Sequence, residues 1–256
     1  MKVIYPLAFL LFFQILFACN ESLEFKATSA TGADNIVFKS TDGGQTWQDI
    51  SEGLPRPAQD DYGVGADGFF ANDNGFYLNA GNGIFHSERN AQAPFWNKET
   101  SGKTWKQIHT GGIRNKVESD GVVLATSNKG IVRSTDNGET WSLVISEGGV
   151  GIDVERIDGG FAAITYSSAS NTRRVRTSYD GGKTWQPIDA GLPADLSIAS
   201  IIQVGENFFC GHPKGIYKST DKGKTWKLIF PSLKGKVFNL SVSGNVIYAI
   251  PRNGGC

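Results

Sequence analysis

Histidines and cysteines, which often perform chemistry in proteins, are few and scattered in this chain of 256 residues. None of His86, His109 and His212 has a Cys or His at the spacing of metal ligands, so we expect no metal site. Cys210 stands in a Phe-Phe-Cys run that is typical of a buried strand. No motif indicates a cofactor, and none is expected.

Carboxylates offer one further possibility. Asp153 and Glu155 lie on one predicted strand and share a face by its two-residue period, so both could approach a central channel. Hydrolysis of a glycoside needs two carboxylates that face one another across a cleft. The simpler interpretation, which we prefer, is that these two neutralise Arg156 and neighbouring basic groups.

The charge balance argues against nucleic acid as a partner. The chain has 25 basic and 25 acidic residues and a formal net charge of zero, whereas nucleic-acid binding needs a basic excess on one face. Hydrophobic residues make up 39% and suffice for a packed core. With 32 Gly and 16 Phe, the composition indicates short aromatic strands joined by tight turns.

The N-terminal residues have the pattern of a targeting segment. Lys2 precedes an apolar run over 3–17, which ends in Leu-Phe-Ala before Cys19. This end resembles the bacterial lipobox, which implies that Cys19 becomes a lipidated N-terminus and anchors the chain to a membrane. We therefore expect a lipoprotein signal peptide at 1–18, a short tether at 19–31 and one domain at 32–256. The mature protein is expected to be a monomer in the bacterial cell envelope, facing the periplasm or the cell surface.

An eight-residue pattern recurs through the rest of the chain. It reads STDGGQTW at 40–47, STDNGETW at 134–141, SYDGGKTW at 178–185 and STDKGKTW at 219–226. A degraded copy ends in GKTW at 102–105. We expect that copy to begin at Ser87 and to be split by an insertion that contains Trp96.

This pattern resembles the Asp-box, or BNR repeat, of sialidases, sortilin-type receptors and photosystem II assembly factors. Asp accepts backbone N–H bonds and Gly tolerates positive φ, so each copy predicts a hairpin turn followed by a Trp that fills the adjacent seam. The residues given this structural role are Asp42, Trp47, Trp105, Asp136, Trp141, Asp180, Trp185, Asp221 and Trp226.

The strands predicted around each copy form a four-stranded antiparallel meander. Between the last two copies these strands are 197–204, 208–211 and 216–219, and a fourth follows Trp226. Successive Trp residues of the five copies are 58, 36, 44 and 41 residues apart, near the length of one propeller blade. The sequence therefore predicts an all-β fold, a five-bladed β-propeller.

The two ends predict how the propeller closes. Residues 35–40 match the third strand of a blade, whereas 237–242 and 246–250 match the first two. Together they would form one composite blade from the N- and C-terminal strands. Five blades depart from the six that are usual in sialidases.

Two classes of function are compatible with these features. Sialidases carry an Arg-Ile-Pro motif before their first Asp-box, but 20–39 contains no Arg, and the one Arg-Ile pair, at 156–157, precedes Asp158. We therefore expect a non-catalytic envelope lipoprotein whose propeller is a platform for binding or assembling a protein or glycan partner. The alternative is a glycan-active, sialidase-like hydrolase on a reduced propeller.

The loops opposite the Asp-box turns are the expected binding face, because loops on a rigid scaffold have the freedom to recognise a ligand. Polar residues of several blades meet there. The predicted contacts are Arg173, Arg174, His212, Lys214 and Arg252.

Overall fold

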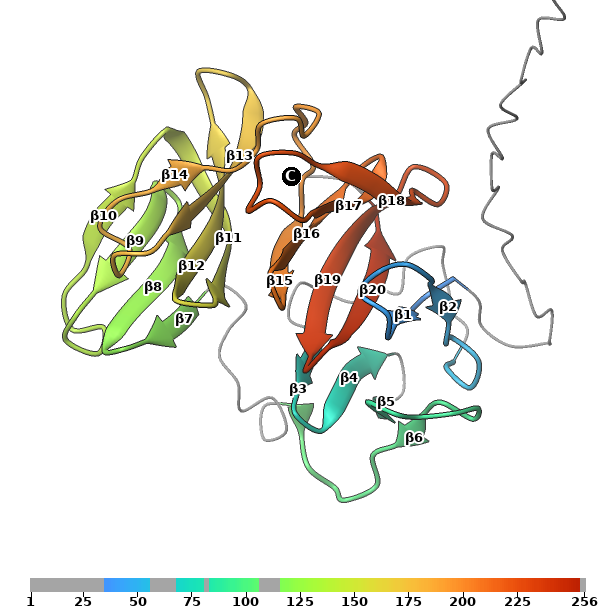
Figure 1. The fold of residues 1–256 in the computed structure, drawn as a ribbon. Helices are drawn as coiled ribbons and strands as arrows, with labels where there is room; N and C mark the ends of the chain where they lie inside the picture. Colours follow the sequence, from blue (N-terminus) through green and yellow to red (C-terminus); the bar gives the residue numbers. More distant parts are fainter. Residues whose placement is uncertain (1–34, 56–67, 81–82, 106–115, 254–256) are drawn as a thin grey trace, which may run out of the picture.

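A computed structural model describes residues 35–55, 68–80, 83–105 and 116–253. The predicted signal peptide and tether, including Cys19, lie outside these residues, as does His109. Within the described residues, twenty strands form five sheets of four strands each, and every neighbouring pair is antiparallel. The molecule is an all-β, five-bladed β-propeller (Figure 1).

Four of the blades are consecutive meanders. The first blade contains β3 (Phe69–Asn72), β4 (Gly75–Ala80), β5 (Gly83–Glu88) and β6 (Asn97–Lys98). The second contains β7 (Lys116–Ser119), β8 (Val122–Ser127), β9 (Gly130–Ser134) and β10 (Ser142–Ile145). The third contains β11 (Gly148–Ile157), β12 (Gly160–Ser167), β13 (Thr172–Ser178) and β14 (Gln186–Pro187). The fourth contains β15 (Ser200–Val204), β16 (Asn207–His212), β17 (Gly215–Ser219) and β18 (Lys227–Pro231).

The fifth sheet joins the two ends of the described chain. Its strands are β19 (Val237–Ser243), β20 (Val246–Arg252), β1 (Phe38–Ser40) and β2 (Gln48–Asp49), in that order. Phe38 pairs with Ala249 and Ser40 with Ile247. The expected composite sheet is therefore present. Strand β20 continues through Pro251 to Arg252, two residues beyond the predicted end.

Neighbouring blades pack face to face through their inner strands. Strand β11 contacts β7, β8 and β9, β15 contacts β11 and β12, β19 contacts β15, β16 and β17, and β3 contacts β19. The spatial order is therefore second, third, fourth, composite and first blade. In Figure 1 the second and first blades stand apart at the two ends of this series.

The core consists of apolar layers between neighbouring blades, because alternate residues of a strand face opposite sides of its sheet. On β16, Phe208 and Cys210 pack with the third blade, whereas Phe209 packs with the composite blade. Phe76 of the first blade stacks on Tyr248 of the composite blade, with ring centroids 4.7 Å apart. Cys210 is buried, as its run predicted, and among the described residues its thiol has no disulfide partner. Within the described ranges, no helix is long and apolar enough to span a membrane.

Candidate functional site

Four of the repeat turns share one hydrogen-bond pattern. In the turn at 178–185, Ser178 Oγ donates to Asp180 Oδ1 (2.8 Å) and accepts the N–H of Gly182 (3.0 Å). Thr184 donates its backbone N–H (2.9 Å) and its hydroxyl (2.6 Å) to the same carboxylate. The equivalent bonds surround Asp42, Asp136 and Asp221. Each Asp therefore ties its own turn.

These hydrogen bonds stabilise the ionised carboxylates. Donors from Ser134 and Thr140 lower the pKa of Asp136 to about 2. Donors from Thr225 and Ser219 lower the pKa of Asp221 to about 2, and Thr184 holds the pKa of Asp180 well below its usual range. A carboxyl group with so low a pKa remains ionised at neutral pH and cannot act as a general acid.

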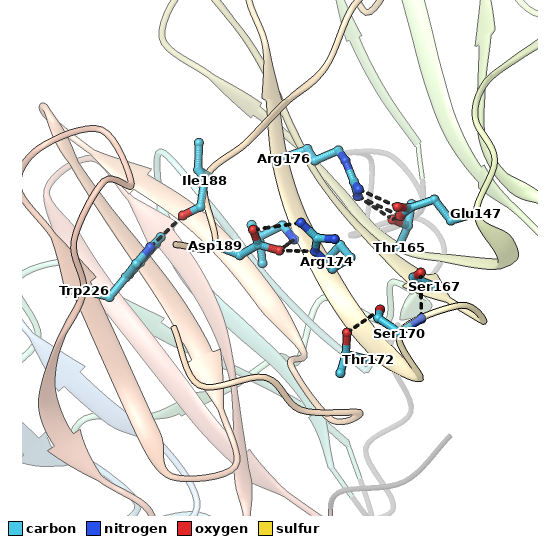
Figure 2. Close-up of polar contacts among 11 residues, drawn as sticks. Glu147, Thr165, Ser167, Ser170, Thr172, Arg174, Arg176, Ile188, Asp189 and Trp226 are labelled. Carbon is cyan, nitrogen blue, oxygen red and sulfur yellow. Dashed lines mark hydrogen bonds and ion pairs between the residues drawn. The ribbon is translucent and has the colours of Figure 1, made fainter. Parts of the chain in front are cut away.

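Three of the Trp residues that end a repeat, Trp47, Trp185 and Trp226, contact the neighbouring blade. Trp226 donates its indole N–H to the carbonyl oxygen of Ile188 in the third blade (2.7 Å; Figure 2). Trp47 stacks on Phe230 of the fourth blade, with ring centroids 5.3 Å apart. Trp185 packs against the apolar cluster of the second and third blades.

Trp141 of the second blade behaves differently. Its side chain is 42% exposed, and its indole N–H donates to Gly138 of its own turn (2.9 Å). The blade that precedes it in the sequence is the first blade, which stands apart in Figure 1. The predicted seam-filling role therefore holds for Trp226 and is not met at Trp141.

The predicted position of the repeat's Trp in the first blade is wrong. His86, which precedes the turn's Ser87, pairs with Asn97. In the third blade the equivalent residue, Thr177, pairs with Gln186, which directly follows Trp185. Trp96, which immediately precedes Asn97, therefore occupies the repeat position that the sequence analysis gave to Trp105. Trp96 is buried and donates to the carbonyl oxygen of Ile50 in the composite blade (2.5 Å).

Trp105 lies elsewhere. Its ring packs beside Phe70, with centroids 5.3 Å apart. The segment that contains Trp96 is thus part of the fold rather than an insertion. The signal that could have identified it is spacing, since Trp47, Trp96, Trp141, Trp185 and Trp226 are 49, 45, 44 and 41 residues apart.

The predicted binding residue Arg174 and its neighbour on the same strand, Arg176, each form an ion pair with a carboxylate. Arg174 forms a two-pronged ion pair with Asp189, at 2.6 Å and 3.3 Å (Figure 2). Arg176 forms another with Glu147, at 2.8 Å and 2.5 Å. Thr165 also donates to Glu147 (2.7 Å). The hydrogen bond from Asp189 raises the pKa of Arg174 above its usual value.

The sequence analysis did not identify Glu147 and Asp189 as partners of these arginines. Each carboxylate lies on a segment next to an outer strand, 29 and 15 residues from the arginine that it binds. No local spacing signals such a pair. The apparent cluster of positive charge on β13 is therefore largely neutralised.

His212 is fully buried and does not line the loop face. Its Nε2 donates to the carbonyl oxygen of Pro193 (2.9 Å), and its Nδ1 accepts the N–H of Lys214 (3.0 Å). Burial lowers the pKa of this imidazole. Because both ring nitrogens already have partners inside the protein, the expected role of His212 as a ligand contact does not fit its position.

Arg173 and Lys214 remain near the loop face. Arg173 donates to the carbonyl oxygen of Ile198 (2.8 Å) on the segment between the third and fourth blades. Lys214 is exposed in the turn between β16 and β17. Arg252 lies at the end of β20 and is half-buried. The structure therefore distributes these three residues over three consecutive blades.

Family comparison identifies the repeat. The model of the BNR/Asp-box repeat matches residues 38–49, 132–143 and 176–187. The chain carries BNR/Asp-box repeats. The copy at 219–226 has the same Asp-box hydrogen bonds, around Asp221.

Several solved structures resemble the chain at low sequence identity. They include an ancestral GH74 enzyme (18% identity, TM-score 0.37, 68% of this chain and 27% of that one). TolB from Acinetobacter baumannii (11%, TM-score 0.39) aligns over 88% of this chain and 64% of its own. A Hadza microbial sialidase (16%, TM-score 0.27) aligns over 51% and 34%. The chain thus spans about a quarter of the GH74 enzyme and a third of the sialidase. A search of curated proteins finds no significant match.

The two carboxylates considered as a possible catalytic pair, Asp153 and Glu155, lie on strand β11 of the third blade. Asp153 and Glu155 pair with Ile164 and Ala162, so they share a face of β11, as expected. Asp153 is buried and accepts the N–H of Ile201 across the seam (3.4 Å). Arg156 projects from the opposite face of the strand, so the preferred pairing with Arg156 does not fit the strand geometry.

The Asp-box propeller also shows no metal centre in its described part. Among those residues, no group of three or more His, Cys, Asp or Glu side chains is arranged to hold an ion.

Proposed function

We propose that this Asp-box propeller is a lipid-anchored protein of a bacterial cell envelope that binds a protein or glycan partner without catalysing a reaction. The observation that supports the proposal is that the carboxylates of the Asp-box turns, of the two arginine pairs and of Asp153 form bonds within the protein. Asp180 and its equivalents tie turns, Glu147 and Asp189 hold arginines, and Asp153 bonds to a backbone N–H across a seam. A glycosidase needs two carboxylates that face one another across a cleft, and the carboxylates named here are bound within the protein instead.

The loop face opposite the Asp-box turns is the proposed partner surface. Arg173, Lys214 and Arg252 supply cationic groups there from three consecutive blades. Such groups form charge-assisted hydrogen bonds with carboxylates, phosphates or sugar oxygens. His212 is not proposed as a contact because it is fully buried, and Arg174 is not because its guanidinium forms a two-pronged ion pair with Asp189.

A glycosidase assay tests the absence of catalysis. Purified full chain is incubated with chromogenic sialosides and a panel of glycosides, and released chromophore is measured. We expect no release above a buffer control. Turnover that is abolished by Glu155→Gln would instead support the glycan-active hydrolase.

Site-specific photocrosslinking tests the partner surface. A photoreactive residue at Lys214 on the loop face is compared with one at Asn137 in an Asp-box turn. Both positions are exposed or partly exposed, and both lie in turns. We expect adducts in envelope membranes from position 214 and none from position 137. The reverse pattern would place the partner on the other end of the propeller.

The lipid anchor has its own test. Because Cys19 follows Leu-Phe-Ala, Cys19→Ser is expected to yield an unlipidated chain that leaves the detergent phase in a phase-partition experiment. Buried methylenes contribute about 0.8 kcal/mol each to membrane binding, so loss of the acyl chains should be easily detected. Unchanged partitioning of the variant would contradict the proposed anchor.

A further inference from the structure

The first blade has lost the chemistry of the Asp-box turn. In the other blades the second residue after the turn's Ser is the Asp that ties the turn, but after Ser87 this position holds Arg89. The Ser87 hydroxyl is buried and has no hydrogen-bond partner in the part of the chain that the structure describes. The segment from Ser87 to Trp96 is also two residues longer than its equivalents. This turn therefore lacks the Asp-centred hydrogen bonds that stabilise the other four turns.

A hollow of about 540 Å³ lies beside this turn of the first blade. Its lining combines two rings with charged and amide side chains: Asp73, Asn74, Tyr77, His86, Glu88, Arg89 and Asn90. They come from the β3–β4 turn, β4, β5 and the segment after β5. The first and third turns of a meander share one end of its sheet, so the hollow lies at the end where the Asp-box turns lie.

One wall of the hollow belongs to a row of stacked rings. Phe70, Tyr77 and His86 are direct cross-strand neighbours on β3, β4 and β5. The ring centroids of Phe70 and Tyr77 are 4.8 Å apart, and those of Tyr77 and His86 are 4.1 Å apart, with interplanar angles of 7° and 11°. Three paired strands hold the row in place. Tyr77 is the middle ring, and because Phe70 and His86 cover its two faces, it presents its edge to the hollow beside the His86 ring.

The polar groups around this wall are also held in place. Arg89 donates from its terminal nitrogen to the Asp73 carbonyl oxygen (2.5 Å) and from Nε to Ser243 Oγ (3.2 Å). The Nε2 atom of His86 lies 3.1 Å from the Asn74 carbonyl oxygen. Since a carbonyl oxygen only accepts, Nε2 of His86 donates this hydrogen bond.

We propose that this hollow binds a neutral saccharide. The carboxylates of Asp73, which lies 4.0 Å from the guanidinium of Arg89, and Glu88 accept hydrogen bonds, so a ligand that binds to both must present several donors. The Tyr77 edge and the His86 ring favour a ligand that also presents C–H groups. A sugar ring carries hydroxyl donors and a C–H face together. Two carboxylates against the single guanidinium of Arg89 disfavour an acidic sugar. None of these residues lies on the loop face, so this site is separate from the proposed partner surface.

A glycan array followed by calorimetric titration tests the site. Full chain in detergent is applied to neutral saccharides and to their acidic and amine-bearing counterparts. We expect binding to neutral saccharides. The double variant Asp73→Asn, Glu88→Gln should weaken that binding at least tenfold, because amides replace two strong acceptors. Both side chains are exposed, so the variant should fold normally.

Glu206→Gln is the matched control, because Glu206 is an exposed carboxylate in the first turn of the fourth blade. Its affinity should equal that of the unchanged chain. Absence of binding to every neutral saccharide, binding to acidic or amine-bearing ligands alone, or equal affinity of the double variant would each overturn the proposed site. None of these outcomes bears on the loop face, which is probed by the crosslinks at position 214.

Discussion

The indole N–H of Trp96 donates to the carbonyl oxygen of Ile50 across the seam between the first and composite blades, at 2.5 Å. Trp226 makes the same bond to Ile188 between the fourth and third blades, at 2.7 Å. Ile50 and Ile188 each follow the Trp of their own repeat by three residues. The first blade has thus kept the seam contact of the repeat although its turn has lost the Asp.

Trp96→Ala is therefore expected to cost about 3–5 kcal/mol of unfolding free energy, since truncation of a buried Trp leaves a cavity. Trp226→Ala should fall in a similar range. Urea unfolding followed by far-UV circular dichroism measures both. A cost near zero for Trp96→Ala would show that the seam does not depend on this side chain.

Trp141→Ala is the matched control for that experiment. Its ring is 42% exposed and bonds only to its own turn, so little apolar burial is lost. We expect a cost below about 1 kcal/mol, as for most exposed substitutions. If Trp141→Ala were as damaging as Trp96→Ala, the second blade would have to bury this ring in solution.

Acid should destabilise the propeller through its Asp-box turns. The unfolded pKa of an Asp is near 3.8, whereas Asp136 and Asp221 have folded values of about 2. The unfolded state therefore binds more protons between these values, and stability falls as pH falls from about 4 to 2. Urea melts at pH 5, 3 and 2.5 should show this loss. Asp136→Asn should reduce the slope of stability against pH, but Asp158→Asn, at an exposed position outside the Asp-box turns, should not.

Arg174→Glu is expected to lower the melting temperature rather than act only on binding. It would remove the partner of Asp189, whose carboxylate is largely buried, and place a like charge beside it. Leaving such a group unpaired costs about 1–3 kcal/mol. The reciprocal double variant Arg174→Asp, Asp189→Arg should recover part of the loss. Thermal melts that showed Arg174→Glu to be neutral would contradict the importance of this pair.

Lys222→Gly is expected to stabilise the fourth blade. Lys222 adopts φ +59°, as Gly43 (+69°) and Gly181 (+70°) do at the same repeat position. A side chain in this left-handed region costs about 1–2 kcal/mol, and the added freedom of glycine in the unfolded chain offsets part of the gain. Differential scanning calorimetry should detect a small rise in melting temperature. A fall would indicate that the Lys222 side chain contributes contacts of its own.

The fold was largely predictable because its repeats are local. A turn such as 178–185 contains its own hydrogen-bond donors and acceptors, so eight residues suffice to identify it. The composite sheet was predictable for the same reason, since each end showed the pattern of half a blade. The first blade was misread because its turn lacks the Asp, and the match then favoured Trp105 over the buried Trp96.

The candidate site was far less predictable, because it depends on pairs that are distant in sequence. Arg174 was predicted to contact a ligand, but the fold brings Asp189 to it, as it brings Glu147 to Arg176. His212 looked like a loop residue, but the strand β16 ends with its ring inside the core. Composition and spacing contain no signal for such burial.

The pairing of β1 with β20 has a consequence for the order of folding. Phe38 is synthesised more than 200 residues before its partner Ala249. At roughly 5–20 residues per second, the first strand waits on the order of ten seconds or more without its neighbour. The composite blade cannot assemble until the rest of the described chain has been made. During that interval β1 has unpaired N–H and C=O groups, so the nascent chain passes through a stage open to strand exchange with other copies.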